Sequence, residues 1–321
     1  GTPSSRWRSA TGTAAGTGSP RRSSTGTPTW TSSPTTATAF RAAAAIPGLL
    51  FHDELLAEGD PNAPWPELDE TTPSSLCYTS GTTGNPKGAV YHHRGAALMA
   101  YANTIHAEMG RHPVYLWTLP MFHCNGWCFP WTITAQAGTH VCLRGVTAKG
   151  MYDAIADSGV THMCGAPIVM GLLVNAPDDQ RREIPAGIKM MTAGAAPPAA
   201  VIEKIERMGF AITHVYGLTE VYGPDVVCAW HEEWDALPIE QRAVFKARQG
   251  VTYPVQEGLM VADAVTLEPV PADGQTIGEV FMRGNVVMKG YLKNPVATLA
   301  VASISRSPGL MVMACNAGVF S

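Results

Sequence analysis

No apolar run in the sequence approaches the ~20 residues that a membrane-spanning helix requires. The N-terminus also lacks the apolar stretch of a signal peptide, so we expect neither a membrane span nor a secretory leader. Seven cysteines in 321 residues are too sparse for a disulfide scaffold, which favours reduced thiols and a cytoplasmic location. No motif of a nucleic-acid binder accompanies the basic residues, so no nucleic-acid partner is predicted.

The first 45 residues lack Val, Ile, Leu, Met, Lys and every acidic residue, yet they contain five arginines. A segment of this composition buries too little apolar surface to offset its ordering entropy, so residues 1–45 are predicted to be a disordered low-complexity tail. A basic regulatory tail is one interpretation. We favour translation of a GC-rich gene out of frame, because the composition changes abruptly near Ile46. Inspection of the other two reading frames tests this hypothesis.

From Ile46 to about Leu299 the sequence alternates between strand-like and helix-like patterns. This alternation favours βαβ units, and therefore an α/β fold with a mainly parallel sheet flanked by helices. A later stretch, residues 258–284, is typical of antiparallel strands with a turn at 272–274. Strands are expected at 75–79, 88–93, 114–120, 138–144, 160–167, 187–194 and 211–217, and helices at 94–109, 148–159 and 197–209.

The segment SLCYTSGTTGNPKGAV, residues 75–90, has the composition of a phosphate-binding loop. Glycines let backbone N–H groups converge on an anion, neighbouring hydroxyls add donors, and Lys87 can neutralise phosphate charge. The order is not that of a Walker loop, because Pro86 precedes the lysine, Gly88 follows it, and the loop joins two strands. An ordinary P-loop NTPase and a polar hairpin that happens to hold a lysine are the alternatives.

Within that segment, YTSGTTGNPKG (78–88) resembles the signature of the adenylate-forming superfamily, which includes acyl-CoA synthetases, adenylation domains and luciferases. Four further segments resemble motifs of the same family, in the family's order: LPMFHCNGW (119–127), GAAPP (194–198), YGLTE (216–220) and GEVFMRGNVVMKGYLKNP (278–295). The residues after YGLTE resemble the branch acting on short- and medium-chain acids, which includes methylmercaptopropionate-CoA ligases. The resemblance covers about residues 46–300. It implies an incomplete large N-terminal domain of the adenylate-forming fold, with a smaller antiparallel β segment near its end.

The resemblance implies a two-step reaction. A carboxylate attacks the α-phosphate of ATP, and coenzyme A then displaces AMP, so ATP, Mg²⁺, coenzyme A and a carboxylic acid are the expected ligands. Positioning and electrostatics would dominate the catalysis. The implied catalytic residues are Lys87, His123, Thr219 and Glu220, with Glu220 also the ligand of the metal. The implied nucleotide-binding residues are Thr79, Ser80, Gly81, Thr82, Thr83, Gly84, Gly194, Ala195, Ala196, Tyr216 and Gly217.

Aromatic and histidine side chains in these motifs have simpler interpretations. Tyr216 and Trp127 could be ordinary core aromatics, although the resemblance makes Trp127 the side chain we expect in the acyl pocket. His123 could be a core histidine, or a zinc ligand together with Cys124 and Cys128. Zinc is disfavoured, because that C-x₃-C pair has no second ligand pair at a suitable spacing.

The last segment departs from the family pattern. No TGD motif follows GYLKNP, and the hinge arginine and the lid domain that the family places after it are not found in residues 301–321, which we expect to be an unrelated tail. Because the lid excludes water and completes the site, little or no turnover is predicted for this chain alone. The function predicted is that of an AMP-forming acyl-CoA synthetase. The alternative is a non-catalytic nucleotide-binding remnant of the same fold. No oligomeric state is predicted.

Overall fold

The computed structural model describes residues 6–10, 50, 52–79, 85–263, 265–273, 275–301 and 312–317. The chain divides into two compact units, one of Gly1–Gly12 with Asp69–Ser321 and the other of Thr13–Leu68. In the smaller unit the described residues include one helix, α2 (His52–Glu58), and the exposed side chain of Trp65. The other described elements belong to the larger unit.

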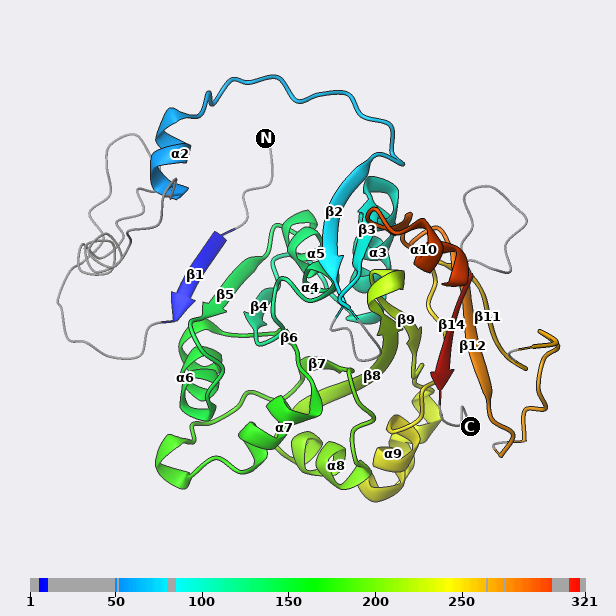
Figure 1. Ribbon diagram of the computed structural model, residues 1–321. Coiled ribbons are helices and arrows are strands. Elements are labelled where there is room, and N and C mark those ends of the chain that lie inside the picture. Colours follow the sequence, from blue (N-terminus) through cyan, green and yellow to red (C-terminus); the bar gives the residue numbers. More distant parts are fainter. Residues whose placement is uncertain are drawn as a thin grey trace. The chain divides into compact units, whose positions relative to one another are not determined.

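An eight-stranded sheet forms the larger unit's centre, in the order β1-β5-β4-β6-β7-β8-β9-β10 (Figure 1). The six strands from β1 to β8 in that order are parallel to their neighbours, whereas β9 and β10 are antiparallel. The sheet confirms the predicted α/β class. Its strands are β1 (Arg6–Ala10), β4 (Val114–Trp117), β5 (Thr139–Leu143), β6 (His162–Cys164), β7 (Ile188–Thr192), β8 (Phe210–Leu218), β9 (Gly223–Val227) and β10 (Val251–Thr252).

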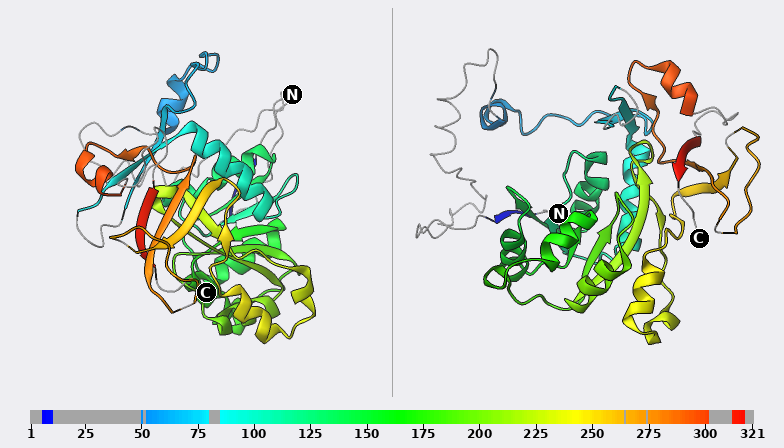
Figure 2. Two further views of the ribbon diagram at one scale, coloured as in Figure 1. Left: turned by 90° about the vertical axis from the view of Figure 1, so that its right-hand side faces the viewer. Right: turned by 60° about the horizontal axis from the view of Figure 1, so that its bottom comes forward.

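Helices cover both faces of this sheet, and each face has its own hydrophobic core. Successive residues of a strand point to opposite faces, so in β4 Leu116 joins one core while Tyr115 and Trp117 join the other. Figure 2 shows the two layers from other sides. The helices packed on the Leu116 face are α6 (Ala148–Ser158), α7 (Pro167–Val174), α8 (Ala199–Arg207) and α9 (Ile239–Lys246), and those on the other face are α3 (His93–His106) and α5 (Phe129–Ala135).

Two small antiparallel sheets complete the unit. One has the order β13-β3-β2, and the other, which contains the antiparallel strands predicted near residues 258–284, has the order β11-β12-β14. The strands are β2 (Pro73–Tyr78), β3 (Gly88–His92), β11 (Gln256–Ala262), β12 (Gly278–Gly284), β13 (Gly290–Tyr291) and β14 (Val312–Ala317). The remaining short elements are α4 (Cys124–Trp127), η1 (Asp178–Gln180), η2 (Thr219–Val221), η3 (Glu232–Ala236) and α10 (Pro295–Val301).

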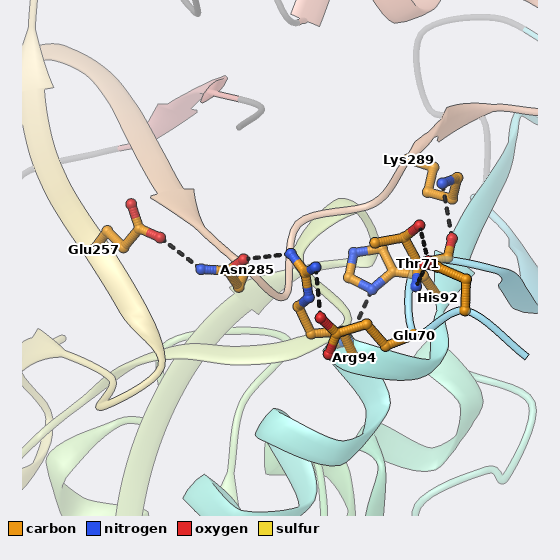
Figure 3. A network of polar contacts seen from close by, with 9 residues as sticks. Glu70, Thr71, His92, Arg94, Glu257, Asn285 and Lys289 are labelled. Carbon is orange, nitrogen blue, oxygen red and sulfur yellow. Dashed lines mark hydrogen bonds and ion pairs between the residues drawn. The ribbon is translucent and has the colours of Figure 1, made fainter. Parts of the chain in front are cut away.

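A polar network joins the start of α3 to both small sheets (Figure 3). The Arg94 guanidinium donates through Nη2 to Glu70 Oε1 at 2.8 Å and through Nη1 to Asn285 Oδ1 at 3.1 Å. The Asn285 amide in turn donates to Glu257 Oε1 at 2.6 Å. This chain of contacts ties the segment between β12 and β13 to the helix that follows β3.

Two strands lie in the segments that we expected to be irregular. Residues 6–10, inside the tail predicted to be disordered, form β1 parallel to β5. Residues 312–317 form β14 beside β12. Most of residues 1–49 and 302–321 lie outside the described part of the chain, so disorder, an out-of-frame origin and the domain boundaries stay predictions. Among the described residues, no helix combines the length and the apolar character that crossing a bilayer demands.

Candidate active site

The carboxyl ends of parallel strands place several predicted site residues on one edge of the main sheet. His123 follows β4, Gly194–Ala196 follow β7, and Thr219 and Glu220 follow β8. Because β4, β6, β7 and β8 are neighbours and parallel, their carboxyl ends meet at the same edge. In open α/β sheets this edge is where ligands bind. The sheet therefore explains why motifs far apart in sequence belong to one site.

The short turn η2, which carries Thr219 and Glu220, is held from two sides by tyrosines of the β13-β3-β2 sheet. The Tyr91 hydroxyl donates to the Thr219 carbonyl oxygen at 2.5 Å. The Tyr291 hydroxyl donates to Glu220 Oε1 at 2.5 Å, and the Met288 N–H donates to the Glu220 carbonyl oxygen at 2.8 Å. Both the backbone and the carboxylate of Glu220 are thus fixed.

Lys87 lies at the end of the phosphate-type loop, immediately before β3. The loop closes through two contacts with Thr79, whose N–H donates to the Lys87 carbonyl oxygen at 2.9 Å and whose Oγ1 accepts from the Lys87 N–H at 3.2 Å. Lys87 Nζ lies 5.2 Å from the centroid of the Tyr291 ring. The loop joins antiparallel strands β2 and β3, which is not the strand-to-helix setting of a P-loop NTPase. The predicted phosphate ligands Ser80, Gly81, Thr82, Thr83 and Gly84 lie outside the described residues.

Backbone geometry accounts for two of the glycines predicted to contact the nucleotide. Gly194 has φ +90°, a conformation that other residues rarely adopt, and it is exposed together with Ala195 and Ala196. Gly217 lies at a β-bulge, where an added Cβ would come within 1.8 Å of the Gly223 carbonyl oxygen. Tyr216, the residue before it, is half-buried against the core of the α3 face.

The structure separates His123 and Trp127, which sequence reasoning had grouped. The His123 side chain is exposed after β4. Trp127 is only 6% exposed, and its carbonyl oxygen accepts a hydrogen bond from Asn103 Nδ2 at 2.7 Å. Its ring belongs to the core of the α3 face. A role for Trp127 in the acyl pocket stays a prediction.

The buried thiols of Cys124 and Cys77 lie near the site, although neither was assigned a role in nucleotide binding from the sequence. Cys124 Sγ donates to Thr219 Oγ1 at 3.7 Å, and Cys77 Sγ donates to the Phe122 carbonyl oxygen at 3.4 Å. A hydrogen bond from the Cys124 thiol lowers the pKa of Cys77, and the same contact, with burial, raises the pKa of Cys124. Cys124 is therefore the thiol that contacts the Thr219 hydroxyl, and Cys77 interacts with Cys124.

The tyrosines that hold η2 were also missed. Tyr91 is 1% exposed and stacks on Tyr222, with ring centroids 3.7 Å apart and planes 12° from parallel. Tyr291 lies inside the quoted motif GYLKNP, which was compared only with the approach to a hinge. The sequence signal for Tyr291 was only its place after Gly290 in a short strand. That signal does not indicate Glu220 as the partner of its hydroxyl.

Glu220 suits a hard cation. Tyr291 occupies Oε1, and Oε2 has no hydrogen bond to any described residue, so one carboxylate oxygen is available to Mg²⁺ beside phosphate oxygens. Within the described ranges, no three His, Cys, Asp or Glu residues gather as a protein-only metal site.

Sequence and structure comparisons identify the class. A sequence profile described as AMP-binding enzyme matches residues 25–292. Acetate/butyrate–CoA ligase AAE7 of Arabidopsis thaliana, named peroxisomal, is 55% identical over 252 residues, which are 78% of this chain and 44% of that protein. Acetate–CoA ligase CCL3 of Humulus lupulus is 53% identical over the same length, again 44% of the relative. The chain thus spans less than half the length of these curated relatives.

Solved structures share the fold at low sequence identity. The inhibitor-bound N-terminal domain of FACL13 from Mycobacterium tuberculosis has a TM-score of 0.68 at 22% identity, covering 87% of this chain and 67% of that one. O-succinylbenzoate coenzyme A synthetase (MenE) from Bacillus subtilis, in complex with ATP and magnesium ion, has a TM-score of 0.63 at 19% identity, covering 81% and 50%. The matched profile and the curated relatives define the class, the adenylate-forming enzymes. The chain belongs to the AMP-binding enzyme family, among the acyl-CoA ligases.

Proposed function

We propose that this chain is part of an AMP-forming acyl-CoA synthetase, which converts a carboxylic acid, ATP and coenzyme A to acyl-CoA, AMP and diphosphate. The observation that carries the proposal is that Lys87 and Glu220 contact the same tyrosine: the Lys87 ammonium lies over the Tyr291 ring, and the Glu220 carboxylate accepts from the Tyr291 hydroxyl. A cation for phosphate next to a carboxylate for Mg²⁺ is the arrangement that phosphoryl chemistry requires.

The roles that we propose for the individual residues are those implied by the resemblance to the adenylate-forming family, and the positions of the described side chains support them. Lys87 and Thr79, at the ends of the loop between β2 and β3, would face the β- and γ-phosphates, together with the residues between them. Thr219 would hydrogen-bond the α-phosphate through Oγ1, and Glu220 would bind Mg²⁺, which neutralises phosphate charge when present. Exposed Gly194, Ala195 and Ala196 would lie along the adenine, with Tyr216 stacking on it and Gly217 allowing close approach.

The acyl side of the site is proposed on weaker geometry. His123, exposed at the end of β4, would lie between the adenylate and the acid and shape the thioester step. Trp127 is buried in the core of the α3 face, so it would contribute to the acyl pocket only if the pocket extends to that core. The curated relatives are named for acetate, butyrate, 2-methylpropanoate and benzoate, so we propose a short-chain or small aromatic acid as substrate. Medium-chain and methylthio acids stay among the predicted substrates.

A non-catalytic nucleotide-binding remnant is the second candidate. It would keep the ATP contacts of the fold without forming an acyl-adenylate. We propose little or no turnover for the chain alone under either function. The compartment also stays open to test, since relatives carry peroxisomal in their names whereas a cytoplasmic location was predicted.

Calorimetric titration of the chain with ATP in the presence of Mg²⁺ tests the proposal. We expect saturable binding at one site, weakened at least about tenfold in Lys87→Ala, because a charge-assisted phosphate contact contributes ~1.5–3 kcal/mol. Lys149→Ala is the matched control, since Lys149 is exposed on α6 and pairs with Asp153. Absent ATP binding, or equal affinities for the three proteins, would contradict the proposed site.

Acid-dependent ATP–pyrophosphate exchange tests for the synthetase function. Exchange above background with acetate, butyrate, 2-methylpropanoate or benzoate supports the synthetase, since it reports formation of an acyl-adenylate. ATP binding with no exchange for any acid is expected of the remnant and also of the chain alone under the synthetase function, so the chimera described in the Discussion then distinguishes the two.

A further inference from the structure

We propose that Tyr291 is a positioning residue for the nucleotide site: its hydroxyl orients the Glu220 carboxylate towards the metal, and its ring supports the Lys87 ammonium. The inference rests on the proposed function, because it assigns a role to a residue beside the proposed phosphate and metal contacts. Lys87 and Glu220 both contact Tyr291, although the three residues are more than 70 positions apart along the chain.

The register between β13 and β3 places the Tyr291 ring beside Lys87. In the β13-β3 pair, Gly290 lies opposite Val90 and Tyr291 opposite Ala89. The pairing continues on both sides, through the Lys289 N–H to the Val90 carbonyl oxygen and the Leu292 N–H to the Gly88 carbonyl oxygen, each at 2.8 Å. Lys87 directly precedes β3, so this register fixes the separation between the lysine and the ring.

The tyrosine itself is held firmly. Its backbone N–H donates to Thr298 Oγ1 at 2.9 Å, and Thr298 belongs to α10. Gly290 has φ +143°, and an added Cβ there would come within 2.8 Å of Thr298 Cγ2, so glycine lets α10 pack closely on β13. Tyr291 is 6% exposed. A ring fixed by backbone pairing and by a helix loses little entropy when it orients another side chain.

The hydroxyl is a dependable donor. The Tyr291 hydroxyl lies 2.5 Å from Glu220 Oε1 and, as a phenol facing a carboxylate, is the donor of that contact. A neutral donor to a carboxylate forms a charge-assisted hydrogen bond, which is stronger than a neutral pair. Because Oε1 accepts this bond, the carboxylate plane is fixed and Oε2 is the oxygen presented to a cation.

The ring acts on Lys87 by a different interaction. An ammonium within about 6 Å of an aromatic centroid is attracted by the ring's quadrupole, and Lys87 Nζ lies 5.2 Å away. The hydroxyl and the ring can therefore be removed separately. Loss of the hydroxyl alone should release Glu220 and leave Lys87 in place, whereas loss of the whole ring should affect both.

Titration of the 321-residue chain with ATP at several Mg²⁺ concentrations separates these effects. In Tyr291→Phe, we expect half-maximal Mg²⁺ enhancement of ATP binding at about five- to tenfold higher Mg²⁺, with Mg²⁺-free ATP affinity unchanged. In Tyr291→Leu, Mg²⁺-free ATP affinity should also fall. If the role of Tyr291 were purely structural, Tyr291→Phe would weaken Mg²⁺-free ATP binding and the Mg²⁺ enhancement together, or it would change neither of them.

Tyr101→Phe is the matched control, because it removes a hydroxyl from a tyrosine that is 65% exposed on α3. It should leave the Mg²⁺ dependence at the wild-type value. Thermal melts of all variants check that each one folds. If Tyr291→Phe shows the wild-type Mg²⁺ dependence while the wild type binds ATP, the inference fails and the proposed function stands.

An ATP-free measurement tests the hydrogen bond directly. With ¹³C at tyrosine Cζ, the Tyr291 resonance can be assigned by its loss in Tyr291→Phe. That resonance should shift in Glu220→Gln and stay in place in Glu268→Gln, a matched change at an exposed glutamate. An unmoved resonance in Glu220→Gln would overturn the inference whatever the ATP titrations show.

Discussion

The carboxyl group of Asp225 lies at 0% exposure in β9, and neither of its oxygens has a hydrogen-bond partner among the described residues. Burial therefore raises the pKa of Asp225 well above its ordinary value of 3.8. In the unfolded chain the same carboxyl ionises near its ordinary value. Above that pH, unfolding releases a proton that the folded state retains, so the folded state loses stability as the pH rises.

Replacing Asp225 by asparagine should remove this pH-dependent loss. We expect the free energy of unfolding of Asp225→Asn to exceed that of the wild type by an amount that grows as pH rises from about 4 to 7. The slope should approach ~1.4 kcal/mol per pH unit. Urea denaturation at several pH values measures the difference. If the free energies of unfolding of the two proteins changed with pH in parallel, the pKa of Asp225 would not be raised in the folded state and the carboxyl would be ionised there.

Asp263→Asn provides a control of opposite sign. The Asp263 carboxylate accepts the Val265 and Thr266 N–H groups at 2.9 and 2.8 Å, and these bonds lower the pKa of Asp263. Its contribution to stability is present above the ordinary carboxyl pKa and is lost as pH falls. The stability difference between Asp263→Asn and the wild type should therefore be unfavourable near neutral pH and shrink in acid.

Single residues also show where sequence reasoning ended. Lys87 was predicted from the glycine- and hydroxyl-rich composition of its loop, whereas Thr219 and Glu220 were implied by the resemblance of YGLTE to a family motif. Tyr291 was not predicted as a partner of Glu220, because their contact depends on the pairing of β13 with β3 across about 200 residues. Local patterns carry no information about that register.

At the scale of elements, α3 begins with an unusual cap (Figure 3). The His92 Nδ1 accepts the Gly95 N–H at 2.9 Å, which satisfies one of the free donors at the helix start. Only a ring nitrogen without a proton can accept, and burial lowers the pKa of His92 below 6.5. Lys289 and Arg94 oppose protonation as well, whereas the Val287 carbonyl and Glu70 favour it.

This cap should make α3 sensitive to acid. For a histidine whose folded pKa is depressed, stability is fully present above the unfolded pKa of 6.5 and is lost as pH falls below it. His92→Asn should keep a capping acceptor without titrating, so it should lose less stability than the wild type between about pH 6.5 and 5. Denaturation curves at each pH measure this difference.

His92→Ala separates capping from titration. Without a capping acceptor it should lose about 1 kcal/mol at neutral pH, where the wild type keeps its cap. Other histidines also have a pKa lowered by burial, so only the difference between variants is informative. Identical acid profiles for His92→Asn and the wild type would show that the cap does not titrate.

The regular elements were the most predictable part of the fold. The strands at 114–117, 139–143 and 188–192 lie inside the predicted ranges, because apolar runs bounded by glycine and proline mark buried strands. Strand β1 was not predicted, since its composition of Arg, Ser, Trp and Ala carries no alternating apolar pattern. The order of the strands in the sheet was not predicted either, because it depends on how the helices pack on both faces of the sheet and not on local sequence patterns.

For the whole molecule, residues 25–292, which match the AMP-binding enzyme profile, contain the buried residues of both main hydrophobic cores and the described nucleotide-side residues. The segment that aligns with acetate/butyrate–CoA ligase AAE7 is 252 residues long, is 55% identical and represents 44% of that protein. Residues that point into a core tolerate exchange when volume and pattern are kept. A chimera in which this segment replaces its counterpart in the Arabidopsis protein should therefore fold.

Such a chimera tests catalysis by this chain's own residues. We expect acyl-CoA formation from acetate or butyrate within about two orders of magnitude of the Arabidopsis parent, since a mismatch of about 2–3 kcal/mol at the joined surfaces costs roughly that much in rate.

Lys87→Ala in the chimera should lower turnover about 10²–10³-fold, the usual effect of removing one group that stabilises transition-state charge. Lys149→Ala should leave turnover unchanged, because Lys149 lies on exposed α6. Liquid chromatography of the thioester product measures all three. A folded, ATP-binding chimera that forms no thioester would favour the remnant, because the relative would have supplied every other part of the enzyme.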